Sequence, residues 1–190
     1  MEAFSTYFWL GYAHITDLAA IDHILFLMVL IVRFQPKEWF DIIITITLFT
    51  IGHSITLILS ALDLFKPSKN WIEFLIPVTI LLSSINNLIS LDKKGGKFTK
   101  WIALLFGLIH GFGFSNYYSM LTNSAGSFWS ALLPFNLGIE WGQLVVVFII
   151  LGVSLLIQNL LNYKHRDWLI FVSGGGFALS LWMAIENSPL

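Results

Sequence analysis

Histidine and acidic side chains occur within segments of this sequence that are apolar enough to cross a membrane. An ionisable side chain at the depth of the hydrocarbon core costs at least roughly 2.5–3.5 kcal/mol on insertion scales, so such residues usually serve a function. Imidazole nitrogens and carboxylate oxygens together form a ligand set for divalent transition metals. The sequence therefore predicts one shared metal site inside the membrane. Its candidate ligands are His14, Asp22, His23, His53, His110 and Glu140.

The composition indicates an integral membrane protein. The chain is 57% hydrophobic and 11% charged, whereas soluble domains carry roughly 25% charged residues. A transmembrane helix needs about 20 apolar residues, so the 190 residues suffice for about six spans. We expect one all-α polytopic domain over residues 1–190, with the lipid bilayer as its partner. A net charge of −1 does not indicate a surface that binds nucleic acid. The absence of cysteine excludes thiolate ligands.

Apolar runs and the polar breaks between them predict where the spans lie. The six predicted spans cover about residues 14–32, 40–64, 71–90, 101–118, 136–157 and 168–185. A seventh would exist if the aromatic N-terminal stretch inserted fully, but we expect that stretch to be interfacial or half-inserted. It contains Glu2 and no basic residue before Tyr12, which is unlike a cleavable signal peptide. The stretch from 116 to 135 is interrupted by Gly126 and Pro134, and either an interfacial or a re-entrant, lid-like segment fits it.

The distribution of basic residues predicts the orientation. With the N-terminus outside, the cytoplasmic loops carry eight of the ten Lys and Arg residues, namely Arg33, Lys37, Lys93, Lys94, Lys97, Lys100, Lys164 and Arg166. The positive-inside rule therefore favours both termini outside. At about 1.5 Å per residue, all candidate ligands then lie between the midplane and the outer surface, with Glu140 about one turn inside. His165 lies in a basic loop and is assigned no site role.

Glycines flank the ionisable residue in three of these segments. His53 follows Gly52, His110 lies between Gly107 and Gly111, and Glu140 lies between Gly138 and Gly142. Small residues let membrane helices approach closely, but close packing does not require a histidine or a glutamate. Two structural alternatives stay open, since Asp22 could cap a helix and His53 could bond to a neighbouring carbonyl. Asn86 and Asn87, in the third predicted span, could face a cavity or bond between helices.

Four stretches resemble the signature motifs of the HupE/UreJ membrane proteins. They are GYAHITDLAAIDHILFL, FTIGHSITL, FGLIHGFGF and FNLGIEWGQ, in family order from Gly11 to Gln143. The resemblance implies a six-helix protein of the bacterial-type inner (plasma) membrane that acts as a nickel or cobalt permease. It carries a metal role over to the six candidate ligands named above.

Two positions depart from the family pattern. Seven residues separate His14 from Asp22, where the family often has five. Two extra residues rotate a position by about 200° around a helix, so His14 can share the site only if the helix starts after it. Asn86 stands where a glutamate is common in the family, which weakens the case for a third carboxylate along a transport path.

The residues also fit an enzyme, as an alternative to a Ni²⁺ or Co²⁺ permease. Three histidines, an aspartate and a serine resemble the ceramidase-like and adiponectin-receptor-like hydrolases, which act on lipid or amide substrates. In that case Zn²⁺ held by His23, His53 and His110 would activate a water. Asp22 would then be the base, and Ser54 would lie near the oxyanion. A sensing or chaperone-like role stays open, as do the metal, which these ligand types do not select, and the formation of a homo-oligomer.

Overall fold

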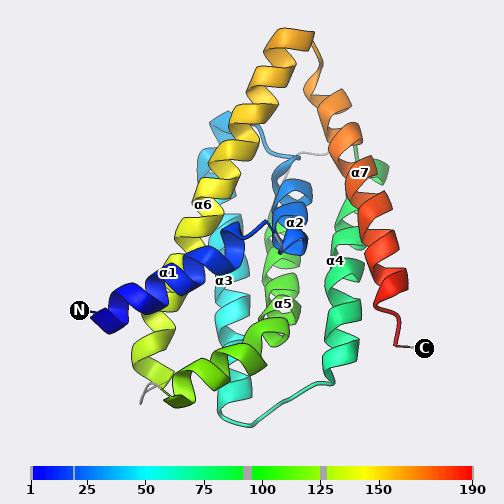
Figure 1. Cartoon of the computed structure of the whole chain (residues 1–190). Helices are drawn as coiled ribbons and strands as arrows, with labels where there is room; N and C mark the ends of the chain where they lie inside the picture. The colour runs from blue at the N-terminus through cyan, green and yellow to red at the C-terminus, as the bar shows by residue number, and fades with distance from the viewer. Residues whose placement is uncertain (1, 19, 92–95, 125–127, 190) are drawn as a thin grey trace.

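The structure is a computed structural model that describes residues 2–18, 20–91, 96–124 and 128–189, with backbone alone for 116–124. Within these ranges the chain is helical and contains no strand, which confirms the predicted all-α fold. Figure 1 shows the helices arranged as one bundle. They are α1 (Glu2–Thr16), α2 (Ile21–Ile31), α3 (Trp39–Ala61), α4 (Lys69–Ile89), α5 (Lys97–Ser124), α6 (Phe128–Leu161) and α7 (His165–Glu186), with a 3₁₀ turn at Pro36–Glu38.

Five of the described helices, α3 to α7, are long and apolar enough to cross a membrane. Helices α1 and α2 are long and apolar enough to cross a membrane only when they are counted as one span, and that span is bent by 71° at the break between them. The bundle therefore has five or six spans, as the apolar pattern predicts. The seven-span alternative finds no support in the described residues, since α1 alone has 15 residues and a span needs about 20.

The first predicted span is wrong in one respect, because residues 14–32 do not form one continuous helix. The backbone N–H of Ala20 donates to the Asp17 carbonyl at 3.0 Å, and this turn separates the two helices. His14 therefore lies in the last turn of α1, while Asp22 and His23 lie in the first turn of α2. No glycine or proline marks this break in the sequence. The break meets the condition under which His14 can share a site with the Asp-His pair.

The stretch from 116 to 135 is divided between two long helices. Helix α5 continues to Ser124, α6 begins at Phe128, and residues 125–127 lie outside the described part. Helix α6 passes through Pro134 without ending. Glu140 is consequently twelve residues into α6, or about 18 Å along it. The expectation that Glu140 lies one turn inside its helix is therefore wrong.

One end of the bundle carries most of the basic residues. We call it the basic end, and its described residues include Arg33, Lys97, Lys100, Lys164 and Arg166. They lie at the connections α2–α3, α4–α5 and α6–α7, which are in the upper half of Figure 1. The ion pair between Lys100 Nζ and Asp41 Oδ1, at 2.6 Å, ties the starts of α5 and α3 together there. Lys93 and Lys94 lie outside the described residues, and the orientation stays a prediction.

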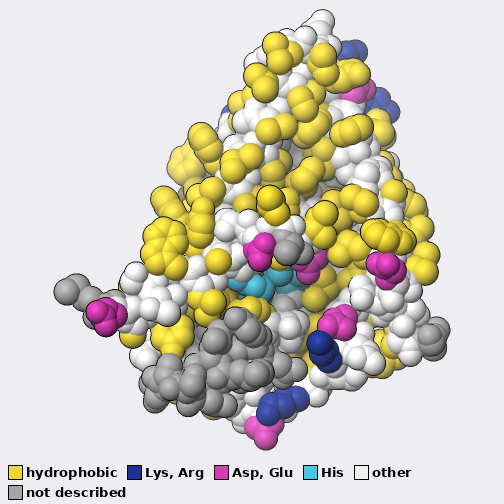
Figure 2. Space-filling model, in the orientation of Figure 1, with side chains coloured by type: hydrophobic (Ala, Val, Ile, Leu, Met, Phe, Trp, Pro, Cys, Tyr) yellow, Lys and Arg dark blue, Asp and Glu magenta, His cyan; other side chains and the backbone are white. Residues whose placement is uncertain are grey.

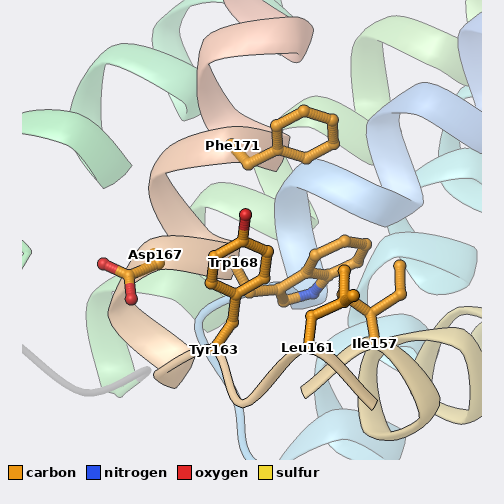
Figure 3. Close-up of a pocket in the computed structure, with 6 residues that line it drawn as sticks. All are labelled: Ile157, Leu161, Tyr163, Asp167, Trp168 and Phe171. Carbon is orange, nitrogen blue, oxygen red and sulfur yellow. The ribbon is translucent and has the colours of Figure 1, made fainter. Parts of the chain in front are cut away.

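Helices α6 and α7 meet at the basic end and diverge away from it (Figure 1). Beside their connection lies a cavity of about 410 Å³. Figure 3 shows its lining residues, Ile157, Leu161, Tyr163, Asp167, Trp168 and Phe171. Its carboxylate, Asp167, caps α7 by accepting a hydrogen bond from the Lys164 backbone N–H at 3.2 Å. We therefore assign this mainly apolar cavity no chemistry.

Glycines place two pairs of helices in direct backbone contact. A Cβ atom added at these positions would collide with a backbone atom of the facing helix. The positions are Gly11 and Gly138 between α1 and α6, and Gly52, Gly107 and Gly111 between α3 and α5. Close approach of this kind favours van der Waals packing, which is a main source of helix association in membranes.

Replacing Gly138 by alanine is expected to destabilise the bundle by about 1–3 kcal/mol, because overpacked interfaces must shift their backbones. The added methyl group would meet the Phe8 carbonyl oxygen of α1. Gly152→Ala on the same helix is the matched control, since nothing lies within 4 Å of its added Cβ. Thermal unfolding in detergent, followed by size-exclusion chromatography, measures both variants. Equal melting temperatures would contradict the assigned contact between α1 and α6.

Candidate metal site

Four histidine rings from four helices lie together in the bundle. They belong to His14 of α1, His23 of α2, His53 of α3 and His110 of α5. The ring of His14 lies 4.5 Å from that of His23 and 5.8 Å from that of His53, between centroids. The rings of His23 and His110 are 5.9 Å apart. With Asp22, whose Oδ1 lies 3.1 Å from His23 Nδ1, the structure brings together five of the six residues predicted as ligands, although ligation itself stays a prediction.

The local structure explains how these rings come together. The break after α1 turns the chain by 71°, so His14 and His23 approach from two helices. Gly52 precedes His53, and Gly111 follows His110. The backbone of His53 lies within contact distance of a Cβ added at Gly111. The glycine packing of α3 on α5 therefore puts both histidines at one interface.

Each histidine of this cluster has at least one buried ring nitrogen without a hydrogen-bond partner among the described residues. These atoms are Nε2 of His14, His23 and His110, and both ring nitrogens of His53. A buried polar atom without a partner costs roughly 1–3 kcal/mol, so each of these nitrogens gains from binding a cation or a water. The donor set therefore suits a cation that accepts neutral imidazole.

Hydrogen bonds fix the tautomer of two of these rings. His110 Nδ1 lies 2.9 Å from the Phe106 carbonyl oxygen, so Nδ1 carries the proton and donates. His23 Nδ1 lies 3.1 Å from Asp22 Oδ1 and donates in the same way. In both rings the lone pair is then left on the unpartnered Nε2. A carboxylate behind a histidine is the arrangement that orients metal-binding imidazoles.

Asp22 contacts His23 in two ways. Its Oδ1 accepts the His23 ring N–H and also the His23 backbone N–H in the first turn of α2, at 2.9 Å. Asp22 therefore both contacts the ring and satisfies an N–H group at the helix end, and its role toward a metal stays a prediction.

The cluster is not a preformed chelate. Within the described ranges, no group of three or more His, Asp or Glu side chains has the arrangement of a metal site. Aromatic rings contact the imidazoles instead. The centroid of Phe114 lies 4.0 Å from that of His14, and the centroid of Phe26 lies 4.9 Å from that of His110. Imidazole rings would have to rotate before several of them could bind one ion.

The phenylalanines around the cluster are residues that the sequence analysis missed. Phe26 is 1% exposed, and its ring lies 4.9 Å from that of Phe49. Phe26 follows His23 by three residues on α2, which places both on the same helix face. This spacing is the signal that would have identified it. Figure 2 shows histidine side chains in a depression of the surface with acidic side chains beside it.

Glu140 lies in a different polar contact. Thr47 Oγ1 of α3 donates to Glu140 Oε1 at 2.5 Å, and Thr50 Oγ1 donates to Gln143 Oε1 at 2.9 Å. Thr47 precedes His53 by six residues, or about 9 Å along α3. Among the contacts of the described residues, Glu140 meets Thr47 and none of the four histidines. Its role as a ligand stays a prediction.

Ser54, the residue expected near an oxyanion in the enzyme alternative, is engaged within its own helix. Its Oγ donates to the Thr50 carbonyl oxygen at 2.7 Å. Asp22, the expected base, is held by His23. The contacts of the described residues therefore give the hydrolase alternative no support.

A family model described as "HupE / UreJ protein" matches residues 1–186. No curated protein and no solved structure matches the chain. The matched region includes every candidate ligand and all of the described helices.

The variant Glu140→Gln is expected to keep its melting temperature, because the amide oxygen can still accept the hydrogen bond from Thr47. Its Co²⁺ affinity should fall about three- to tenfold, since a negative charge near a divalent cation contributes favourable Coulomb energy. Titration of purified protein with Co²⁺ measures the affinity. Thr47→Val is the companion variant, because it removes the hydrogen bond and keeps the charge. A lower melting temperature with unchanged affinity in Glu140→Gln would show that Glu140 is only structural.

Proposed function

This chain belongs to the HupE/UreJ family, and we propose that it is a permease that moves Ni²⁺ or Co²⁺ across the bacterial inner membrane. The family is known for nickel and cobalt transport. The observation that supports the proposal in this chain is the cluster of four histidines with unpartnered buried nitrogens. Neutral imidazole nitrogens suit such ions. The metal is the substrate of the protein.

The broken first span supports the same proposal. Substrate sites in many transporters lie where transmembrane helices are discontinuous. Here the C-terminal end of α1 and the Asp22 carboxylate lie on either side of the break. The carbonyl groups at a helix C-terminus carry partial negative charge and favour a cation. A hydrated cation would be captured there by His14 and Asp22, and would exchange its waters for His23, His53 and His110.

The lack of a preformed chelate is consistent with transport. An ion that crosses a membrane must bind well enough to enter and weakly enough to leave, as in ion channels. A resident zinc in a hydrolase is instead held by three protein ligands with a fourth position open. The described residues contain no such arrangement.

The variants His23→Ala and His110→Ala are expected to lower Ni²⁺ uptake into proteoliposomes at least tenfold, because each removes a cluster nitrogen. His165→Ala is the matched control and should transport like the unmodified protein, since His165 begins α7 at the basic end. Protein purified without added metal should contain far less than one metal per chain by elemental mass spectrometry. It should then bind Ni²⁺ or Co²⁺ reversibly on titration.

A different result would favour the enzyme. If the purified protein holds about one Zn²⁺ per chain, and both site variants lose it, the hydrolase hypothesis is favoured over the permease. Hydrolysis of lipid and amide substrates would then be assayed. If both variants still take up Ni²⁺, the histidine cluster is not part of the transport route.

A further inference from the structure

Two adjoining spaces lead from the basic end toward the middle of the bundle. The first is a cavity of about 530 Å³ with a mainly apolar lining that includes Ile89 and Phe98, and its polar lining residues are Arg33, Asn86, Ser90, Lys97 and Thr99. We call it the vestibule. A second space of about 10 Å³, enough for about one water, is lined by Asn86 and Thr99 as well and by Val29, Ser83 and Asn87. We call it the inner pocket. Because the two share Asn86 and Thr99, they adjoin.

The inner pocket contains a hydroxyl group without a partner. Ser83 is 5% exposed, and its Oγ has no hydrogen-bond partner in the described part of the chain. Among the buried serines of the described residues, Ser180 donates to the Gly176 carbonyl oxygen at 2.6 Å, whereas the hydroxyls of Ser84 and Ser173 have no partner either, and of these three unpartnered serines only Ser83 lines the inner pocket. The Ser83 Oγ is therefore available to a water or an ion.

A cationic side chain occupies the oxygens next to this pocket. Arg33, 5% exposed, donates from Nε to Asn87 Oδ1 at 3.0 Å. Its two terminal nitrogens donate to the Ser90 carbonyl oxygen at 2.8 Å and to the Asn86 carbonyl oxygen at 3.0 Å. Three oxygens thus surround one positive charge. Amide, carbonyl and hydroxyl oxygens are also ligands for divalent cations, and a guanidinium among them repels such an ion.

An apolar barrier separates these two spaces from the histidine cluster. Along α2, His23 belongs to the cluster, Phe26 packs against Phe49 and His110, and Val29 lines the inner pocket. Six residues separate His23 from Val29, which corresponds to about 9 Å along a helix. The barrier between the two regions is therefore nearly two helical turns thick at α2.

We propose that the vestibule and the inner pocket form the exit half of the transport pathway, and that Arg33 closes it in this structure. A divalent cation that passes Phe26 binds the oxygens of Ser83 and Asn87 after Arg33 has withdrawn. This inference rests on the proposed permease function and adds to it a second binding site and a gate. It assigns a function to the basic end, where the sequence analysis found none.

Cysteine accessibility tests the exit route directly, because the chain has no cysteine of its own. Ser83→Cys exchanges one small side chain for another and places a thiol in the inner pocket. Leu82→Cys is the matched control, since Leu82 is 51% exposed on the apolar surface of the same helix. Lys164→Cys and Lys66→Cys, which are exposed at opposite ends, report which face of a vesicle the reagent reaches.

The probe is a small, membrane-impermeant methanethiosulfonate added to oriented membrane vesicles. Ser83→Cys should react at least tenfold faster from the basic face than from the opposite face, and Leu82→Cys should react from neither. Adding Arg33→Gln should raise the basic-face rate at least fivefold. Millimolar Ni²⁺ should slow the reaction in that background. Arg33→Lys, which keeps the charge but donates fewer hydrogen bonds, should give an intermediate rate if Arg33→Gln does not fold.

Uptake of Ni²⁺ by the unmodified protein is measured alongside, because it tests the permease function separately from the exit route. Uptake with no basic-face reaction of Ser83→Cys in either Arg33 variant would overturn the exit route and leave the permease standing. Reaction without uptake, and without protection by Ni²⁺, would overturn the permease and the exit site together. A basic-face rate that does not change with Arg33 would overturn its role as the gate.

Discussion

The backbone contact between α3 and α5 is the constraint on which the histidine cluster depends. Gly52, Gly107 and Gly111 remove the side chains that would separate the two helices. His53 and His110 are then held at one interface and away from lipid, and they are 0% and 2% exposed. A polar imidazole ring inside a membrane is destabilising where it meets lipid hydrocarbon, so these rings must be enclosed by helices. The glycines and the histidines are therefore parts of one arrangement.

The break between α1 and α2 completes the cluster by bringing His14 to it. Because α1 packs on α6 through Gly11 and Gly138, its direction is set by α6 and not by α2. The chain must turn between these two helices, and the break between Thr16 and Ile21 provides the bend of 71°. Two helix ends then face each other inside the bundle beside ionisable residues. This is the combination that discontinuous helices provide in many transporters.

Helix α2 connects the two polar regions of the molecule. Its eleven residues, Ile21–Ile31, include the Asp-His pair in the first turn and Phe26 in the middle, and they end two residues before Arg33. Arg33 and Asn87 fasten its end to α4, and Asn87 Nδ2 also donates to the Val29 carbonyl oxygen at 2.8 Å. These hydrogen bonds hold the end of α2 against α4. The proposed exit route requires Arg33 to leave its three oxygen partners.

The sequence by itself determined the all-helical membrane fold, the approximate positions of the spans and the histidines that gather. It could do so because hydropathy over about 20 residues reports burial in lipid, and because ionisable residues are rare in such segments. The family motifs gave the expected substrate. Boundaries were less accurate, since the apolar surroundings of Pro134 gave no sign that α6 begins at Phe128.

Only the tertiary structure decided the bend after α1, the pairing of Glu140 with Thr47 and the capture of Asn87 by Arg33. Each depends on residues far apart in the chain, which a local pattern does not report. Thr47 and Glu140 are 93 residues apart, and Arg33 and Asn87 are 54 apart. Hydropathy assigns residues to the membrane, but it does not say which helices meet. The packing of the helices therefore decides which polar groups form hydrogen bonds with one another.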